Sequence, residues 1–174
     1  MLHILGGMDS LSSGTYRYED MEVSKFSADR LNVFRRDHIS FVFQNASLMK
    51  YYSVAENVEM PLLSKNLNKK ERKKIVQEKM EAVGIDHLAK KLPGHLSGGE
   101  QQRCAIARAL ASGNDLLLAD EPTGALDQNT GKEIMEVFKQ VHEMGKTIVL
   151  ITHDPNVAAY ADRVLRIEDG KIVE

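Results

Sequence analysis

Short apolar runs alternate with amphipathic stretches through the chain, and this alternation predicts an α/β fold. Apolar runs of about five residues suit buried strands. Apolar residues that recur every three or four positions suit helices packed against those strands. Because helices separate the strands, a parallel sheet is expected. The predicted core strands are Ile39–Phe43, Leu116–Ala119 and Thr147–Ile151, and the predicted helices around them are Ser97–Ser112 and Gln128–Glu143.

The two ends of the chain carry weaker patterns. Met1–Leu5 is typical of the end of a helix stopped by two glycines, and Ser27–Arg36 is typical of a helix opened by a serine cap. Thr15–Tyr18 is a candidate for a short strand. Near the carboxyl terminus, Val164–Ile167 and Lys171–Val173 flank an Asp-Gly pair, which favours a β-hairpin.

The section from about residue 54 to residue 92 differs in character. Val54–Leu63 is helix-like, and Asn68 lies three residues before Glu71, a capping-box arrangement that opens a charged helix to Val83. The section is polar and rich in lysine. We therefore expect a helical lobe inserted into one domain that spans residues 1–174, with the remaining residues forming the α/β core.

Composition narrows the function classes without choosing among them. A chain of 174 residues favours a single domain, and one cysteine excludes a disulfide framework. The formal net charge of −2 gives no bulk argument for nucleic acid, and the basic residues of 69–74, which have acids nearby, indicate a solvated face instead of a basic stripe. No apolar run approaches the roughly 20 residues of a membrane helix. A role at a membrane would thus need a partner that holds the protein there.

Leu96–Arg103 is the strongest chemical signal. Ser97 is placed to cap a helix whose first turn holds Gly98 and Gly99. Glycines let backbone N–H groups approach an anion closely, and a helix N-terminus carries partial positive charge. These residues predict a phosphate-binding helix end, although an ordinary capped helix with a flexible start has the same local pattern.

Three further signals follow directly after predicted strands. Gln44 follows the first strand, Asp120 and Glu121 end the second, and His153 follows the third. Ligands of α/β sheets bind at the carboxyl ends of the strands. There a carboxylate and an amide can serve Mg²⁺, a second carboxylate can act on water, and a histidine can reach a phosphate. Alone, each residue also fits a structural role; together they indicate a nucleotide site.

With these motifs in order, the chain resembles the ATP-binding domain of ABC transporters over essentially its whole length. Leu96–Arg103 resembles the signature motif and Leu116–Asp120 resembles the Walker B strand. Glu121 matches the catalytic glutamate, Gln44 the Q-loop glutamine and His153 the switch histidine, and Ala125–Asp127 match the D-loop.

The resemblance implies a P-loop NTPase-like core and a mechanism. Two domains would pair head to tail around ATP and Mg²⁺, and a membrane permease would dock on the helical lobe at the cytoplasmic face. The resemblance implies that Glu121 acts on the attacking water and that His153 stabilises the transition state. It implies Mg²⁺ binding by Gln44 and Asp120, and coupling of the two sites by Asp127. The residues implied to bind nucleotide are Ser97, Gly98, Gly99, Gln102 and Asp127.

Four segments point to a subgroup of that family. Phe41–Gln44, Glu56–Leu62, Ala119–Asp127 and Leu2–Asp9 are similar to bacterial exporters of macrolides, lipoproteins and bacteriocins or antimicrobial peptides. The resemblance favours export of a drug, a peptide or a lipoprotein, and leaves the substrate open.

The sequence contains no G-x-x-x-x-G-K-[ST] motif, which in the resembled group immediately precedes a segment like Met1–Asp9. We expect an N-terminally truncated domain without its P-loop strand, and weak binding of Mg-ATP by these 174 residues alone in a titration. A misassigned start, a fragment or broken gene, and a genuine non-hydrolysing module all remain open. The intact Glu121, His153 and signature argue against a gene that has been nonfunctional for a long time.

Two other functions compete with transport. A non-transport ABC ATPase acting on chromosomes would carry long coiled coils between Gln44 and Ser97, and one acting on ribosomes would carry two signatures; neither is found. A regulatory module that does not hydrolyse ATP is the third possibility.

Overall fold

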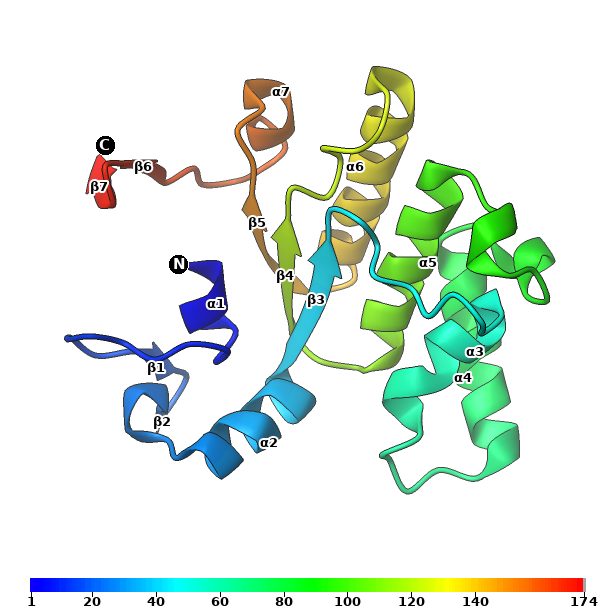
Figure 1. Cartoon of the computed structure of the whole chain (residues 1–174), viewed down its shortest axis with the longest axis horizontal. Helices are drawn as coiled ribbons and strands as arrows, with labels where there is room; N and C mark the ends of the chain where they lie inside the picture. The colour runs from blue at the N-terminus through cyan, green and yellow to red at the C-terminus, as the bar shows by residue number, and fades with distance from the viewer. Residues whose placement is uncertain (174) are drawn as a thin grey trace.

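A sheet of three parallel strands organises the protein (Figure 1). In the computed structural model, which describes residues 1–173, the strands are β3 (Ile39–Phe43), β4 (Leu116–Asp120) and β5 (Thr147–Ile151), in the order β3-β4-β5. Both strand pairs are parallel and in register, so the last residues of the three strands lie in one row. The predicted α/β class and the three core strands are confirmed.

One face of the sheet is covered by α5 (Gly98–Ala111) and α6 (Gln128–Glu143) (Figure 1). Each helix is joined to the following strand by a short connection and runs antiparallel to it. The N-termini of both helices therefore lie at the same edge as the carboxyl ends of the strands. This arrangement places the predicted phosphate-binding helix end level with the predicted catalytic residues.

The helical lobe packs on the far side of α5. It contains α3 (Val54–Glu59), α4 (Lys69–Ala82) and the short 3₁₀ segments η2 (Met60–Leu62) and η3 (Asp86–Leu88), and η4 (Pro93–His95) leads from it to α5. The helix predicted over residues 54–63 thus changes to a 3₁₀ turn at Met60, where Pro61 removes a backbone donor.

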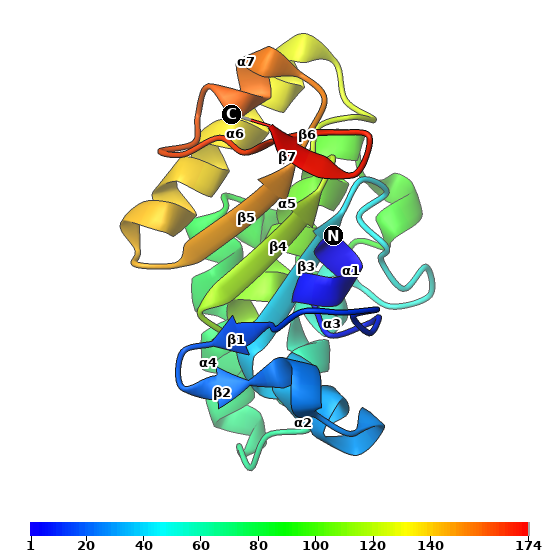
Figure 2. The ribbon, with the colours of Figure 1, turned by 90° about the vertical axis from the view of Figure 1, so that its left-hand side faces the viewer.

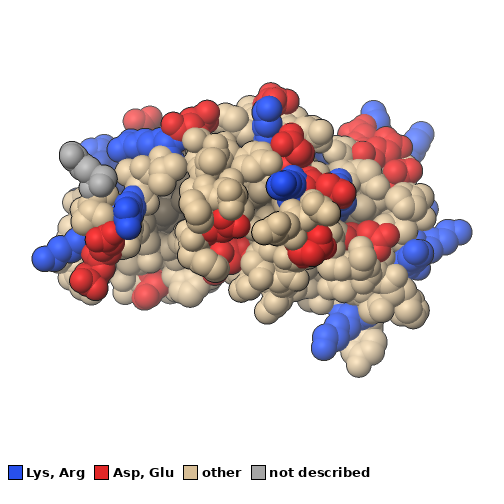
Figure 3. Space-filling model, turned by 90° about the horizontal axis from the view of Figure 1, so that it is seen from above, with Lys and Arg blue, Asp and Glu red and all other residues tan. Residues whose placement is uncertain are grey.

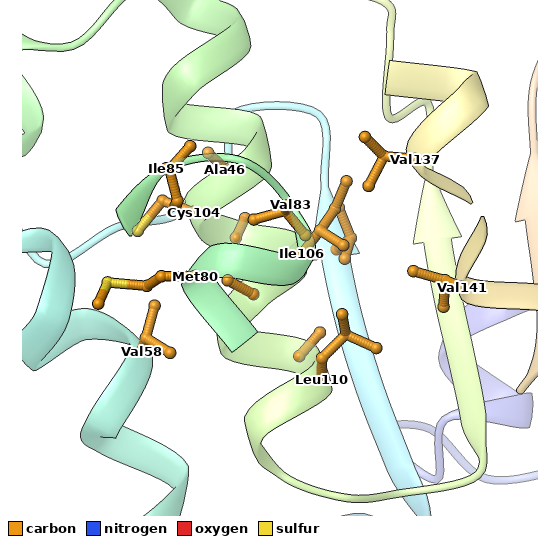
Figure 4. Packing of buried hydrophobic residues seen from close by; sticks show 14 of the residues in the cluster. Ala46, Val58, Met80, Val83, Ile85, Cys104, Ile106, Leu110, Val137 and Val141 are labelled. Carbon is orange, nitrogen blue, oxygen red and sulfur yellow. The ribbon is translucent and has the colours of Figure 1, made fainter. Parts of the chain in front are cut away.

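A single core runs from the lobe to the sheet, with α5 at its centre (Figure 4). Val58 and Met80 of the lobe pack on one side of α5, and Val137 of α6 packs on the other. The run Cys104–Ala107 is completely buried. The lobe therefore has no core of its own, and its orientation is tied to α5.

The N-terminal segments lie on the second face of the sheet, in front of β3 and part of β4, and leave β5 in view (Figure 2). These are α1 (Leu2–Leu5), the short antiparallel pair β1 (Arg17–Tyr18) and β2 (Met21–Glu22), η1 (Val23–Lys25) and α2 (Ala28–His38). Phe34 is buried at the centre, with the rings of Tyr16, Tyr18 and Phe26 edge-on around it. The predicted strand near residue 15 is shorter than expected, and its partner β2 was not predicted, because two-residue strands leave no alternating pattern.

The chain ends with α7 (Pro155–Ala158) and the antiparallel hairpin of β6 (Arg166–Glu168) and β7 (Lys171–Val173). The predicted hairpin is confirmed, but its first strand begins at Arg166 instead of Val164, because the two-residue turn sets the register from its own centre. The hairpin is largely exposed, and in the described residues 1–173 no strand pairs with the outer edge of β5.

No helix within residues 1–173 combines the length and the apolar character that crossing a membrane requires.

Candidate active site

The site is built by the parallel register of the sheet. Phe43, Asp120 and Ile151 are paired across the three strands, so the residues that follow them, Gln44 and Glu121 among them, leave the sheet at one edge. The structure thus brings together the four polar residues predicted from three separate strands. Seen from this edge, acidic and basic side chains are interspersed, and neither sign dominates (Figure 3).

Glu121 is held by the segment that follows β5. Its backbone N–H donates to the carbonyl of Ile151 (2.9 Å). Its carboxylate accepts hydrogen bonds from the backbone N–H of His153 (3.1 Å) and the hydroxyl of Thr152 (3.3 Å). Glu121 also adopts a left-handed backbone conformation, with φ of 45°. Non-glycine residues in that region persist only where their surroundings impose it, which is common at functional sites.

The imidazole of His153 is paired with the same carboxylate. Nδ1 of His153 lies 2.7 Å from Oε1 of Glu121, and because an ionised carboxylate can only accept, the ring nitrogen donates. This hydrogen bond, supported by the negative charge of Glu121, raises the pKa of His153. The histidine side chain is 85% exposed, whereas that of Glu121 is 22% exposed. An anchored carboxylate beside an exposed imidazole suits proton transfer and phosphate contact.

Gln44 lies against the turn after β4. A Cβ added at Gly124 would lie 2.7 Å from Nε2 of Gln44, so the glycine leaves the room that the amide occupies. Among residues 1–173 no group of three or more His, Cys, Asp or Glu side chains could hold a metal ion. Mg²⁺ is commonly held by one or two protein oxygens together with substrate phosphates and water. Gln44 and Asp120 fit that donor set, and a cation there would neutralise phosphate charge.

The signature segment has the predicted form. Ser97 accepts a hydrogen bond from the backbone N–H of Glu100 (3.2 Å), and Glu100 accepts one from the backbone N–H of Ser97 (2.7 Å). This reciprocal bond to the Ser97 N–H lowers the pKa of Glu100. A hydroxyl that accepts one hydrogen bond can still donate its own proton to a phosphate oxygen.

The two signature glycines are packed against the start of α6. A Cβ added at Gly99 would lie 2.6 Å from the methyl group of Thr130, and one added at Gly98 would lie 3.0 Å from a methyl group of Leu126. Glycine is required here for close packing. The signature is therefore in contact with the segment that contains Asp127.

Asp127 caps α6. Its carboxylate accepts from the backbone N–H groups of Asn129 (3.0 Å) and Thr130 (3.1 Å) and from the Thr130 hydroxyl (2.6 Å). The Thr130 hydroxyl is the main reason that the pKa of Asp127 is lowered. The structure thus assigns Asp127 a capping role, and its coupling role between two sites stays a prediction.

Gln102 does not fit the predicted contact with nucleotide. Its side chain is buried, with 2% exposed, and it donates to the carbonyl oxygen of Phe43 (3.1 Å). It therefore anchors the end of β3 from within the core.

Sequence reasoning missed Thr152, which lies between two strong signals and forms no recognisable motif. Cys104 is a buried core residue, and burial raises the pKa of its thiol to about 11.

Comparison with known proteins supports the arrangement. Residues 1–124 match the family model described as "ABC transporter". Over 173 residues the chain is 43% identical to the macrolide export ATP-binding/permease proteins MacB of Shigella flexneri and of Escherichia coli K12, covering 99% of this chain and 27% of each relative. The chain therefore spans about a quarter of the length of these curated relatives.

Solved structures show the same fold. The ATP-binding cassette MJ0796, in its dimeric post-hydrolysis state bound to ADP and Pi, superposes with a TM-score of 0.87 at 39% identity, covering 99% of this chain and 77% of that one. CbiO1 from Clostridium perfringens, part of the ABC transporter complex cbiONQ, gives a TM-score of 0.90 at 30% identity, covering 99% of this chain and 69% of that one. From its sequence, its fold and the geometry at its sheet edge, the chain belongs to the ABC transporter family of ATP-binding cassettes.

Proposed function

We propose that this chain is the ATP-hydrolysing part of an ABC exporter that drives a partner permease, with a drug, a peptide or a lipoprotein as the cargo. The observation that carries the proposal is the Glu121–His153 pair at the carboxyl edge of the sheet, level with the signature end of α5. The likeness to MacB supports export, since MacB is named as a macrolide export ATP-binding/permease protein.

In this proposal the chain's own residues divide the work. Glu121 orients the attacking water and accepts its proton, and His153 donates a hydrogen bond to the γ-phosphate. The carbonyl oxygen of the Gln44 amide and the Asp120 carboxylate would hold Mg²⁺, which would neutralise phosphate charge. The N-terminus of α5 contacts the γ-phosphate held by a second cassette, and Asp127 couples the two sites. The dimeric structures of MJ0796 support pairing of two cassettes.

The permease would dock on the helical lobe at the cytoplasmic face of the membrane. A concave site of about 590 Å³ lies there, lined by residues of α3 and α4 and by Ala89 and Lys90. Glu56, Glu59 and Lys73 line it together with Val76 and Met80. Such a mixed lining suits an amphipathic helix of a partner.

As it stands, the 174-residue polypeptide is proposed to bind Mg-ATP weakly, because its sequence holds no P-loop motif and that loop supplies most phosphate contacts in P-loop NTPases. The proposal concerns this polypeptide alone, and tight binding in a titration would contradict it.

The test of hydrolysis uses the protein purified from membranes together with its permease. Glu121→Gln should lower kcat about 100-fold or more, the usual contribution of a general base, while nucleotide remains bound. Glu143→Gln, at the exposed end of α6 on the opposite edge, is the matched control and should leave kcat unchanged. Unchanged hydrolysis in Glu121→Gln would remove the proposed role, and no hydrolysis in the native complex would favour a regulatory module.

A further inference from the structure

Arg108 of α5 makes an unusual use of its charge. It donates from Nη1 to the carbonyl oxygen of Ser47 (2.7 Å) and from Nη2 to that of Ala46 (2.8 Å). Within residues 1–173 no carboxylate lies at ion-pair distance from it, and burial lowers the pKa of its guanidinium. Charged side chains are rarely taken out of water unless they are paired. Here the planar fork is directed at two consecutive backbone carbonyls instead.

The two residues that it contacts have a backbone that needs support. Ala46 and Ser47 follow each other in the left-handed region, with φ of 53° and 47°. Residues with a Cβ rarely adopt this conformation, and two in succession persist only where contacts impose it. These residues lie in the turn immediately after Gln44, so the conformation of that turn decides where the Gln44 amide lies.

The same helix also bonds to the backbone on the other side of Gln44. Gln102 donates to the carbonyl oxygen of Phe43 (3.1 Å), and Gln102 and Arg108 lie six residues apart on α5. Two side chains of one helix thus hold the backbone on both sides of Gln44. The far end of the loop is fixed separately, since the buried Asn57 of α3 bonds to Met49, Tyr52 and Ser53.

We infer that Arg108 is a positioning residue: with Gln102 it fastens the Gln44 turn to α5, so that Gln44 and the signature end of the helix move as one unit. The inference rests on the proposed function where it concerns ATP. There, Gln44 serves the Mg²⁺ of one nucleotide and the signature contacts the other. A displacement of α5 caused by one nucleotide would then shift a metal ligand of the other.

The first test is amide hydrogen exchange on the full chain, read at single residues. The N–H groups of Ala46 and Met49 are hydrogen-bonded and report the two ends of the turn. Arg108→Ala should speed exchange at Ala46 by about tenfold or more, because local opening no longer breaks two charge-assisted hydrogen bonds. Exchange in β4 and α6 should stay unchanged. Arg108→Lys keeps the charge and most of the stem but loses the fork, and should give an intermediate effect.

Arg103→Ala is the matched control, since Arg103 is an arginine of the same helix that bonds to Val83 and Glu133 and not to the turn. It should leave Ala46 unchanged. Equally faster exchange at all amides of the Arg108 variants would show a general stabilising role and overturn the inference. Unchanged exchange at Ala46 would overturn it as well. If the alanine variant does not fold, the lysine variant decides by the same criteria.

The second test uses the complex with the permease. It separates the positioning role of Arg108 from the metal-binding role of Gln44. Arg108→Lys should raise several-fold the Mg²⁺ concentration needed for half-maximal hydrolysis, with a smaller change in kcat. A merely structural role would lower kcat through the active fraction and leave the Mg²⁺ dependence alone. Faster exchange at Ala46 without any change in Mg²⁺ dependence would support the positioning role of Arg108 and count against Gln44 as a metal ligand.

Discussion

At the scale of single residues, the hydrogen bond between Glu121 and His153 predicts a measurable change in the pKa of the histidine. Because the carboxylate raises that pKa, Glu121→Gln should return it toward the ordinary value. The sign follows from linkage: the pair stabilises the fold fully below the ordinary histidine pKa, and this stabilisation is lost as pH rises through the elevated value. Titration of the imidazole by NMR measures it, and Glu143→Gln should leave it unchanged. An equal pKa in wild type and Glu121→Gln would show that the pair is not formed in solution.

A second residue-scale prediction concerns Gly6. Its φ of −77° suits any residue, but an added Cβ would collide with the ring of Phe41. Gly6→Ala should therefore lower the free energy of unfolding by about 1–3 kcal/mol, the usual cost of overpacking. Urea unfolding measures it. Gly94→Ala, where nothing lies within 4 Å of the added atom, should change stability little. Equal effects of the two substitutions would rule out a steric cause.

The residues themselves were largely predictable, and their roles less so. Gln44, Glu121 and His153 are each placed by a strand that ends one or two residues earlier, so their meeting at one edge follows from the sequence pattern. The burial of Gln102 does not follow from the sequence pattern, because the motif that contains it indicates an exposed helix start. Arg108 and Thr152 were missed, since their importance lies in contacts with distant backbone, which no local pattern records.

At the scale of elements, the caps of α5 and α4 offer a matched comparison. Ser97→Ala removes the acceptor for the N–H of Glu100 and should cost about 1 kcal/mol in unfolding free energy. Asn68→Ala removes the acceptor for the N–H groups of Lys70 and Glu71 and should cost a similar amount. Only Ser97→Ala should also reduce hydrolysis by the permease complex. A matching loss of hydrolysis in Asn68→Ala would mean that the effect is one of stability alone.

Elements with long periodic patterns were predicted well, and short ones were not. The capping boxes at Asn68 and Ser97 fix their helix starts, and both are present. The pair β1 and β2 has only two residues per strand and depends on packing around Phe34, which acts over a long distance in sequence. The relation between lobe and core was equally beyond the sequence, because it depends on α5 packing with both.

At the scale of the whole molecule, the exposed hairpin of β6 and β7, together with the edge of β5 that no strand pairs with in residues 1–173, predicts self-association of this 174-residue chain. Ile167 and Ile172 are 45% and 60% exposed, and an exposed strand edge is a ready template for another chain. Sedimentation should show association that rises with concentration and that Ile172→Lys reduces. Met144→Lys, an equally exposed apolar residue at the end of α6, is the control. Association unaffected by Ile172→Lys would show that the hairpin is not the contact.

The left-handed backbone at Glu121 also determines which mutations this position can accept. A glutamate codon reaches glutamine, lysine, aspartate, alanine, glycine and valine by one nucleotide change. Valine, branched at Cβ, is the least compatible with that backbone, whereas glycine adopts it freely. The genetic neighbours that fold most readily therefore include one that removes the carboxylate altogether. Substitution of Glu121 by glycine is therefore expected to give a folded protein that lacks the proposed base, whereas substitution by valine is expected to give a less stable one.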